Sequence, residues 1–510
     1  MRKGMQKALC AIALIPLLLS GCWQEDLPAE EDTALLPAES SAEVAQAGAH
    51  LPECFSLPYA PAQTLDPISC PDGMQQTVAS LLYEGLFRLD SHIEPQNLLC
   101  GSYTYDAEKP QYVFTLRPGV TFSDGTALTA ADVKSTLDRA RTSERYGARL
   151  AAVTSVSARD DTVTVTLSAP NTGFPALLDI PIVKKGTENS AVPTGTGPYF
   201  FSQEEGGAYL IANQSWWQQK ERPTERIALE ETSSHDAMLY RFTSHDLQLI
   251  TADLTGTLPV SVTGNVACHD AETTVLQYVG INTARDGLSD PALRRALSQG
   301  INRGSIVSAY LSGHGVAAQF PVSPVSPLYP SQLETAYSHD GFTAALAETQ
   351  LPERTLTLLV NGENSFKVSI ASHLAETFTE EGLSVETRVL PWADYTAALA
   401  AGDFDLYYGE VRLTADWDLS PLLATGGTLN YGGWSDAQTD HLLTLYASAA
   451  ERGDAMERLC TRLKNQAPIL PVCFKSVSIL TQADVVEGLS PTMAEPFYDL
   501  SACVIHLKEG

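Results

Sequence analysis

Apolar and polar positions alternate along residues 111–117, QYVFTLR, which is the pattern of a strand with one buried face. The same alternation returns in 153–168, where Val163, Val165 and Leu167 share one face. Two consecutive aspartates lie in the middle of this second segment, so it predicts a hairpin that turns at them.

Two segments carry residues that are typical of the start of a helix. The stretch TAADVKSTLDRAR, 129–141, predicts a helix with Thr129 as its N-cap and Asp132 three residues on, as in a capping box. In 290–311 a second helix is expected to start at Asp290, followed by a proline at the first helical position, where its missing N–H costs nothing.

Residues 355–411 alternate between strand-like and helix-like segments. In chain order these are TLTLLVN, FKVSIASHLAETFTEE, LSVETRVL, ADYTAALAAG and DFDLYYGEV. Gly382 and Gly402 are expected to end the two helices. A β-α-β-α-β order predicts a parallel sheet with right-handed crossovers, and hence an α/β fold.

The acidic stretch RLTADWDLSP, 412–421, follows the last of these strands. In open α/β sheets, ligands bind beyond the carboxyl ends of the strands. Asp416, Trp417 and Asp418 are therefore placed where such folds bind ligands, although an acidic surface loop would give the same pattern. A chain of 510 residues is also too long for one core, which predicts two or three domains.

The N-terminus predicts secretion and lipidation. Arg2, Lys3 and Lys7 precede an apolar run over 8–19, which is shorter than the roughly 20 residues of a membrane span. The run ends in LSGC, a bacterial lipobox pattern, so Cys22 is expected to be cut free of a leader at 1–22 and to carry lipid.

Residues 23–50 contain acids, alanine, serine and proline, and no lysine or arginine. They bury too little apolar surface to fold and predict a disordered tether. The whole chain carries a formal charge of −29, and without the three bases of the leader 29 bases face 61 acids, a balance of −32. Such an acidic protein is not expected to bind nucleic acid or anionic membrane surfaces directly.

Seven cysteines remain once Cys10 leaves with the leader and Cys22 takes lipid. Some should pair outside the cytoplasm, and an odd number leaves at least one without an intramolecular partner. Cys54 and Cys268 are one candidate pair, although the sequence does not fix the connectivity. The chain has no Cys-x-x-Cys, which excludes thioredoxin-type and zinc-knuckle motifs.

The common catalytic motifs are absent from the sequence. It contains no phosphate-binding loop ending in Gly-Lys-Ser/Thr, no His-Glu-x-x-His and no Gly-x-Ser-x-Gly. The glycines of GTGPY, 195–199, are expected to serve a tight turn. His269, His339 and His441 show no metal-ligand spacing, so neither a metal nor a cofactor is expected.

Asp416 and Asp418 have two chemical interpretations. On an extended segment their side chains point the same way, roughly 6.5–7 Å apart at the backbone, which is compatible with the carboxylate pair of a secreted glycosidase. A carboxylate in a closing cleft would instead neutralise a ligand ammonium, with Trp417 adding apolar area and a cation–π face.

Several segments in order resemble the extracellular solute-binding proteins of peptide/nickel-type ABC transporters, the oligopeptide- and dipeptide-binding family. They are TLDPI, LLYEGLFRLD, YVFTLRPGVTFSDGTALTAADVKSTLDRA, VPTGTGPYFF, YVGINTARDGLSDPALRRALSQGINRGSIV, DFDLYYGEVRLTADWDLSP, NYGGWSDAQTDHLL and APILPVCF. The resemblance covers nearly everything from residue 51 onward, with a lipobox in front.

This resemblance implies a type II periplasmic-binding-protein-like fold, in which two α/β lobes are joined by two crossing strands and enclose the ligand. It places lobe 1 at 51–276 with an extra subdomain at about 80–192, lobe 2 at 277–477, and a return to lobe 1 at 478–510. It also implies a monomer without catalytic activity that hands its ligand to permease subunits.

The resemblance further implies a peptide site. Asp416 matches the aspartate that pairs with a peptide α-ammonium, and Trp392 matches a tryptophan that lines the cavity. Tyr83, Glu84 and Tyr278 fall at or near cleft-lining positions.

One position departs from the family pattern. Dipeptide binders carry an arginine early in the helix that begins near Phe366, to hold the ligand carboxylate, and this chain has Val368 and Ser369 there, with only Lys367 nearby. The departure favours longer peptides, held mainly through their backbones. A nickel complex, haem or a sugar in the same fold, and a secreted hydrolase, remain the alternatives, and a signalling role stays open.

The expected location is the extracytoplasmic face of the cell membrane, with the protein held by lipid on Cys22. That location faces the periplasm in a Gram-negative cell. In a Gram-positive-type envelope the anchor would retain a receptor that nothing else holds.

Overall fold

The computed structural model describes residues 51–508, except 72 and 259. The predicted leader, the lipobox at Cys22 and the tether at 23–50 lie outside the described residues. Within the described part, no helix combines the length and the apolar character that crossing a bilayer requires.

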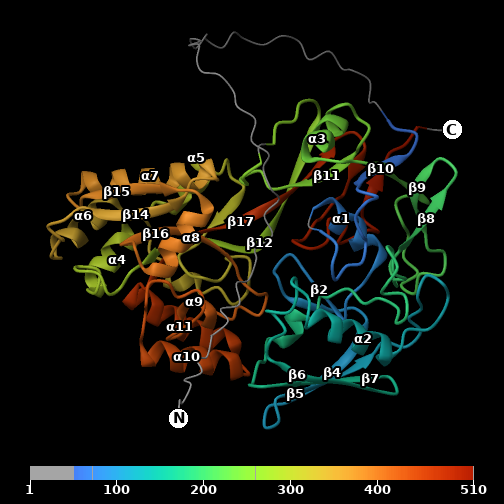
Figure 1. Cartoon of the computed structure of the whole chain (residues 1–510), viewed down its shortest axis with the longest axis horizontal. Helices are drawn as coiled ribbons and strands as arrows, with labels where there is room; N and C mark the ends of the chain where they lie inside the picture. The colour runs from blue at the N-terminus through green and yellow to red at the C-terminus, as the bar shows by residue number, and fades with distance from the viewer. Residues whose placement is uncertain (1–50, 72, 259, 509–510) are drawn as a thin grey trace, which may run out of the picture. The chain divides into compact units, whose positions relative to one another are not determined.

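A seven-stranded sheet is the largest sheet of the described residues (Figure 1). In spatial order its strands are β11 (Leu249–Ala252), β17 (Ile469–Gln482), β12 (Val266–Ile281), β16 (Leu406–Arg412), β14 (Leu356–Asn361) and β15 (Val385–Leu390), and β13 (Gly315–Ala317) also pairs with β17.

The predicted β-α-β-α-β unit is confirmed. Strand β14 pairs in parallel with both β15 and β16, and the crossovers are α7 (Ser365–Glu380) and α8 (Trp392–Ala401). Gly382 follows α7 with φ 96°, and Gly402 ends α8 with φ 65°. Both are left-handed conformations that glycine adopts without a Cβ clash, which is why the helices end there.

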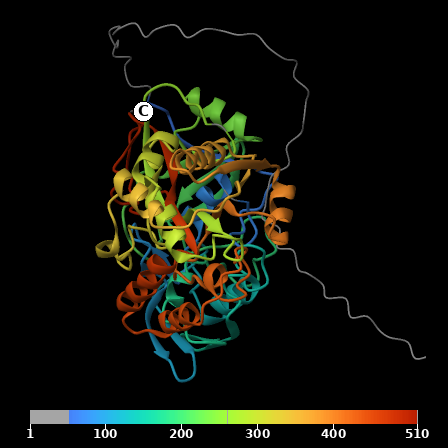
Figure 2. The same ribbon diagram turned by 90° about the vertical axis from the view of Figure 1, so that its left-hand side faces the viewer.

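Strands β12 and β17 are the longest of the described strands, with 16 and 14 residues. They pair antiparallel, and both views show red β17 running beside green β12 (Figures 1 and 2). The predicted lobe boundaries, after 276 and before 478, fall inside these two strands. The β12–β17 pairing thus passes through the place where the sequence puts the crossing between lobes, and its register shifts there, between Glu272 and Leu276 and between Gln277 and Tyr278.

The earlier part of the chain forms two four-stranded sheets. The first contains β1 (Phe55–Tyr59), β10 (Arg226–Glu231), β9 (Gly207–Ala212) and β8 (Tyr199–Glu204). The second contains β4 (Cys100–Asp106), β5 (Gln111–Leu116), β7 (Thr162–Leu167) and β6 (Val153–Arg159).

The second of these sheets confirms the strand and hairpin predictions. Strands β6 and β7 join at Asp160, which has φ 51°, and Val163, Val165 and Leu167 are buried on one face. Helix α2 (Ala130–Ala140) packs on this sheet, and the Asp132 carboxylate accepts a 2.9 Å bond from the Thr129 backbone N–H, as the capping box predicts.

The segment 290–311 forms two helices rather than one. Helix α4 (Pro291–Gln299) starts with Asp290 as its N-cap, as predicted, and α5 (Arg303–Tyr310) follows. The break arises because Asn302 acts as a new N-cap, its side chain accepting a 3.2 Å bond from the Ser305 N–H.

The remaining elements complete the described chain. They are α1 (Met74–Leu82), β2 (Phe87–Leu89), β3 (Pro95–Asn97), η1 (Phe174–Leu177), α3 (His235–Thr243), η2 (Ser331–Leu333), α6 (His339–Ala347), α9 (Ser420–Leu423), α10 (Ala437–Ser448), α11 (Arg452–Gln466), β18 (Val486–Glu487) and β19 (Val504–Ile505).

Hydrophobic cores lie on both faces of the seven-stranded sheet. One joins buried residues of β14 and β16 to α4, α6 and α7. The other joins β12 and β16 to α8, α10 and α11, and it also includes Leu89, Ile93 and Ala176 from the predicted extra subdomain. This second core therefore connects segments of both predicted lobes.

The glycines of GTGPY allow close backbone approach. A Cβ on Gly195 or Gly197 would overlap the carbonyl group of Leu82 at the end of α1, and the Gly197 N–H donates a 3.0 Å bond to that carbonyl. They serve backbone packing.

The predicted Cys54–Cys268 disulfide is wrong. No disulfide joins any of the seven cysteines of the described part. The Sγ of Cys54 approaches the Arg226 carbonyl at 3.8 Å, beside β10, whereas Cys268 lies on β12 next to Asp270. Cys54 directly precedes β1, whose sheet is not the one that contains β12, a relation that cysteine spacing does not reveal.

Candidate ligand-binding site

Asp416 lies in a tight turn just after β16, at the carboxyl end of the parallel strands. The turn is closed by a 2.9 Å bond from the Trp417 N–H to the Thr414 carbonyl, and Trp417 has φ 54°. Within the turn, Thr414 Oγ1 donates a 2.5 Å hydrogen bond to Asp416 Oδ1. Asp416 thus follows the last strand of the β-α-β-α-β unit, as the sequence predicts.

A residue far away in sequence supplies the second donor to this carboxylate. Asn171 Nδ2 donates a 2.7 Å bond to Asp416 Oδ2, and Asn171 follows β7 in the predicted extra subdomain of lobe 1. Sequence reasoning missed Asn171, because no local pattern marks a contact across 245 positions.

Asp416 is buried, with 3% of its surface exposed. Burial raises its pKa above the ordinary range, against the lowering effect of the bonds from Thr414 and Asn171. Among the ion pairs of the described residues, none includes the Asp416 carboxylate. It is a buried acid with neutral hydrogen-bond donors and no ion pair among the described residues, and the positive charge of the nearby Arg452 guanidinium also lowers its pKa.

The backbone carbonyl of Asp416 is fixed separately. Tyr446 donates to it through its hydroxyl at 2.8 Å, and the Arg452 guanidinium donates to the same oxygen. Gly173 lies against that guanidinium, where an added Cβ would come within 2.6 Å of a nitrogen. These contacts hold the turn against α10 and α11 and bring the segment after β7 close to it.

Trp417 is fully buried in the core that joins both predicted lobes. Its ring meets Phe474 of β17 edge to face at 5.8 Å, and its indole Nε1 is a buried donor with no hydrogen-bond partner in the described part. The cation–π role of this tryptophan stays a prediction, and the structure adds a buried indole N–H without a partner among the described residues.

Two more predicted residues belong to this same core. Tyr278 of β12 is buried, and its hydroxyl lies 3.1 Å from that of Tyr407. Trp392 is half-buried at the start of α8 and stacks on Tyr395 at 5.9 Å. The structure thus groups Trp417, Tyr278 and Trp392 around one core.

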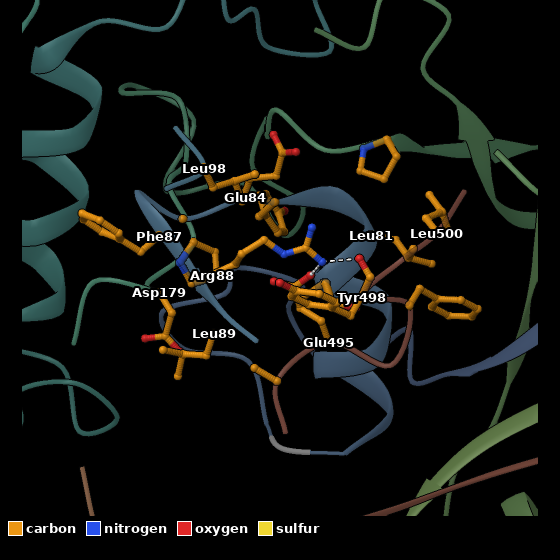
Figure 3. A pocket seen from close by; sticks show the side chains of 18 of the residues that line it. Leu81, Glu84, Phe87, Arg88, Leu89, Leu98, Asp179, Glu495, Tyr498 and Leu500 are labelled. Carbon is orange, nitrogen blue, oxygen red and sulfur yellow. Dashed lines mark hydrogen bonds and ion pairs between the residues drawn. The ribbon is translucent and has the colours of Figure 1, made fainter. Parts of the chain in front are cut away.

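Tyr83 and Glu84 lie elsewhere, beside a cavity of about 120 Å³ between α1, β2 and the C-terminal segment (Figure 3). The Tyr83 hydroxyl donates to the Pro193 carbonyl at 2.9 Å. The Asp416 turn does not line this cavity.

The Glu84 carboxylate accepts four hydrogen bonds. Its donors are Thr196, Trp216, Trp217 and Gln218, at 2.7 to 3.2 Å. Burial raises the pKa of Glu84, and the four bonds oppose that rise. Because a carboxylate has about four acceptor sites, these bonds give Glu84 a complete set of internal partners.

An ion pair on one wall of the same cavity joins two segments far apart in sequence. Arg88 lies over the Tyr498 ring at 3.6 Å and pairs with Glu495 at 2.9 Å. Burial raises the pKa of Glu495 to about 7, although the Arg88 guanidinium acts in the opposite direction.

The lysine near the position of the family arginine is already paired. Lys367 Nζ lies 3.2 Å from Glu410, and Lys475 Nζ approaches the same carboxylate at 3.7 Å and Asp253 at 2.6 Å. The two lysines hold the pKa of Glu410 below its ordinary value despite burial. Lys367 is therefore not a lone cation awaiting a ligand carboxylate.

Asp418 has a local structural role. It is exposed, and its carboxylate accepts a 2.9 Å bond from the Ser420 N–H at the start of α9. Asp416 and Asp418 thus differ in exposure and in partners, and Asp418 has the position of the acidic surface loop that the sequence left open.

The fold defines the class of protein. Solved structures that resemble the chain include AppA from Bacillus subtilis in complex with a nonapeptide, with a TM-score of 0.60 at 20% identity, covering 89% of this chain and 100% of that one. NikZ from Campylobacter jejuni in complex with Ni(L-His) gives a TM-score of 0.62 at 17% identity, covering 88% and 98%. The chain has the type II two-lobed fold of substrate-binding proteins.

The family follows from the sequence comparison. Residues 94–430 match the model of "Bacterial extracellular solute-binding proteins, family 5 Middle", so the chain belongs to this family. The glutathione-binding protein GsiB of Salmonella typhimurium is 27% identical over 442 residues, covering 79% of this chain and 84% of GsiB. The protein is thus a solute-binding component of an ABC importer, a class of proteins that are not enzymes.

Proposed function

We propose that the protein captures peptides between its two lobes and delivers them to the permease subunits of an ABC importer. The observation that carries this proposal is the buried Asp416 carboxylate, which has two neutral donors and no paired cation among the described residues. A buried charge without a counter-charge is costly, and a ligand ammonium would remove that cost.

The hydrogen-bonding capacity of Asp416 supports this role. Asn171 and Thr414 occupy one acceptor position on each oxygen, and the Asp418 N–H reaches Oδ1 only at 3.4 Å. A carboxylate offers about four acceptor positions, so at least one remains for an ammonium. The unpartnered Trp417 Nε1–H would donate a hydrogen bond to a peptide carbonyl oxygen.

Known relatives bind several solutes, and their chemistry is compatible with an amine-binding site. Glutathione, named for GsiB, is a tripeptide with one free α-ammonium, and the AppA structure holds a nonapeptide. Histidine in the Ni(L-His) complex of NikZ also carries an amine. The peptide proposal rests on the Asp416 site and includes longer peptides, because Lys367 is paired internally and is not free to fix a terminus at dipeptide distance.

The remaining parts of the proposal follow from the sequence. Lobe 1 spans 51–276 and 478–510, lobe 2 spans 277–477, and hinge motion about β12 and β17 closes the site around the ligand. The protein acts as a monomer and is anchored by lipid on Cys22, which membrane fractionation tests.

The first experiment compares two neighbouring aspartates by calorimetric peptide titration. The variant Asp416→Asn should lose peptide affinity on the order of a hundredfold, because removing one partner of a buried charge pair costs about 2–5 kcal/mol. The matched control Asp418→Asn should bind like the wild type, since its exposed carboxylate only accepts a bond from the Ser420 N–H.

Acetylation of the peptide amine tests the same contact by changing the ligand instead of the protein. N-acetylated peptides should bind the wild type as weakly as free peptides bind Asp416→Asn. Equal affinity of free and acetylated peptides, or of the wild type and Asp416→Asn, would remove Asp416 from the site. The same titration identifies the ligand class when it is repeated with glutathione, with nickel and histidine, and with peptides of two to nine residues.

A further inference from the structure

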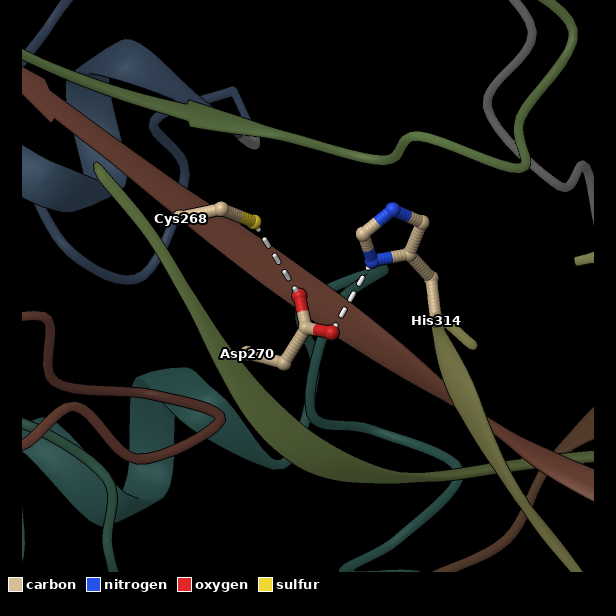
Figure 4. A group of neighbouring side chains, drawn as sticks. All are labelled: Cys268, Asp270 and His314. Carbon is tan, nitrogen blue, oxygen red and sulfur yellow. Dashed lines mark hydrogen bonds and ion pairs between the residues drawn. The ribbon is translucent and has the colours of Figure 1, made fainter. Parts of the chain in front are cut away.

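A thiol, a carboxylate and an imidazole meet on the β12–β17 strand pair. Cys268 and Asp270 are two positions apart on β12, so their side chains leave the same face of the sheet. His314 comes from the turn before β13, and Figure 4 shows all three side chains pointing toward one another.

The distances approach those of a metal site. Cys268 Sγ lies 3.6 Å from Asp270 Oδ1, His314 Nδ1 lies 2.9 Å from Asp270 Oδ2, and one ligand atom from each residue lies within 4.8 Å of the others. Ligands in a tetrahedral zinc site, at about 2.0–2.3 Å from the ion, are about 3.3–3.7 Å apart. Small side-chain rotations would bring the three atoms into that range.

Neighbouring groups orient the three side chains. Ser478, the cross-strand partner of Asp270, donates a 2.6 Å bond to Asp270 Oδ1. A turn with positive φ at Ser312 and Gly313 presents His314, whose carbonyl accepts from the Ser476 N–H at 3.4 Å. Such outer contacts fix the direction of metal ligands.

The surroundings are electronegative. Glu272 is half-buried and Ser476 is buried at a nearby paired position of the same strands, where their side chains interact with each other. Among the ion pairs of the described residues, Asp270 has only His314. The chain as a whole carries a formal charge of −29, which favours the approach of cations.

We propose that Cys268, Asp270 and His314 bind a divalent transition-metal ion of the Zn²⁺ class. On binding, the thiol gives its proton to solvent, and the thiolate sulfur, a carboxylate oxygen and the neutral imidazole nitrogen donate electron pairs to the ion. Thiolate and carboxylate together balance the two positive charges, and water takes the fourth position. The site shares no residue with the Asp416 turn and is independent of the proposed peptide function.

A zinc titration of the full-length protein tests this site. The protein is first stripped of metal with a chelator, and zinc is then added in competition with a chromophoric chelator. The wild type should bind one ion per chain. The variants Cys268→Ala and His314→Ala should each weaken binding by more than about tenfold, as should the shape-conserving Asp270→Asn. The controls Cys54→Ala and His269→Ala should bind like the wild type, because neither residue belongs to the group.

Cobalt gives a second readout. Co²⁺ bound through Cys268 produces a thiolate-to-cobalt charge-transfer absorption, which should persist in Cys54→Ala and vanish in Cys268→Ala. Zinc affinity that is unchanged in folded Cys268→Ala and Asp270→Asn would overturn the site. So would zinc binding that is lost in Asp416→Asn, which would assign the ion to the ligand cleft instead.

Discussion

Two buried carboxylates in this protein are stabilised to different extents. Glu84 accepts hydrogen bonds from four side chains, whereas Asp416 has two close side-chain donors and a third, weaker contact at 3.4 Å. Burial raises the pKa of both. A carboxylate with all its acceptor positions used is a structural element, and one with a position left over can take a ligand. At the residue scale, this difference favours Asp416 over Glu84 as the contact for a peptide amine.

Glu495 should make the stability of the protein depend on pH. Its folded pKa of about 7 lies above the ordinary value of 4.5. The folded protein therefore binds the proton more tightly, and its free energy of unfolding should fall as pH rises from about 4.5 to 7. In Glu495→Gln this contribution is absent, so the wild type should lose about 1–3 kcal/mol relative to the variant across that range.

Urea unfolding at pH 5 and pH 7.5 measures this difference. The control Glu108→Gln, at an exposed turn between β4 and β5, should follow the pH profile of the wild type. Parallel profiles of the wild type and Glu495→Gln would contradict the prediction.

At the element scale, β12 depends on a glycine beside a large ring. Gly280 pairs with Tyr407 of β16, and a Cβ on Gly280 would overlap the Tyr407 ring. That ring cannot move easily, because its hydroxyl contacts the Tyr278 hydroxyl in the buried core. The close packing of β12 on β16 therefore requires a residue without a side chain.

Two glycine-to-alanine substitutions should have opposite effects. Gly280→Ala should lower the free energy of unfolding by about 1–3 kcal/mol through overpacking. Gly304→Ala on α5, where nothing lies within 4 Å of the new Cβ, should raise it by about 0.5–1 kcal/mol. Urea unfolding followed by tryptophan fluorescence measures both, and effects of the same sign would contradict this account of β12.

At the scale of the whole described chain, the segment after β7 contacts residues that lie far away in the sequence, in the predicted lobe 2. Asn171 bonds to Asp416, and the Thr172 N–H donates a 2.9 Å bond to the Ala447 carbonyl at the end of α10. His92 reaches the Val325 carbonyl at 2.9 Å. Contacts of this kind join the Asp416 turn and its surroundings to the predicted extra subdomain of lobe 1.

The variant Asn171→Ala should loosen this association without unfolding either lobe. Hydrogen exchange of the Thr172 amide in the ligand-free protein should become faster by about tenfold, equivalent to about 1.4 kcal/mol. Exchange in α7, which makes no contact with Asn171, should stay as in the wild type. Unchanged exchange at Thr172 would show that the Asn171 bond to Asp416 does not hold the segment.

The sequence by itself determined the local structure and the class of this protein. Capping at Thr129, the hairpin at Asp160 and the β-α-β-α-β run depend on neighbours within a few residues, and the structure has all of them. Family motifs along the chain similarly indicated the two-lobed solute-binding fold. The location of Asp416 followed from the rule that ligands bind beyond strand ends.

Only the tertiary structure decided which distant residues meet. Asn171 reaches Asp416, Arg452 reaches the same turn, and Cys268 lies with Asp270 and His314 rather than with Cys54. The physical reason is that these contacts depend on how sheets and helices pack across long stretches of chain. Propensity, capping and periodicity act over a few residues and carry no information about that packing.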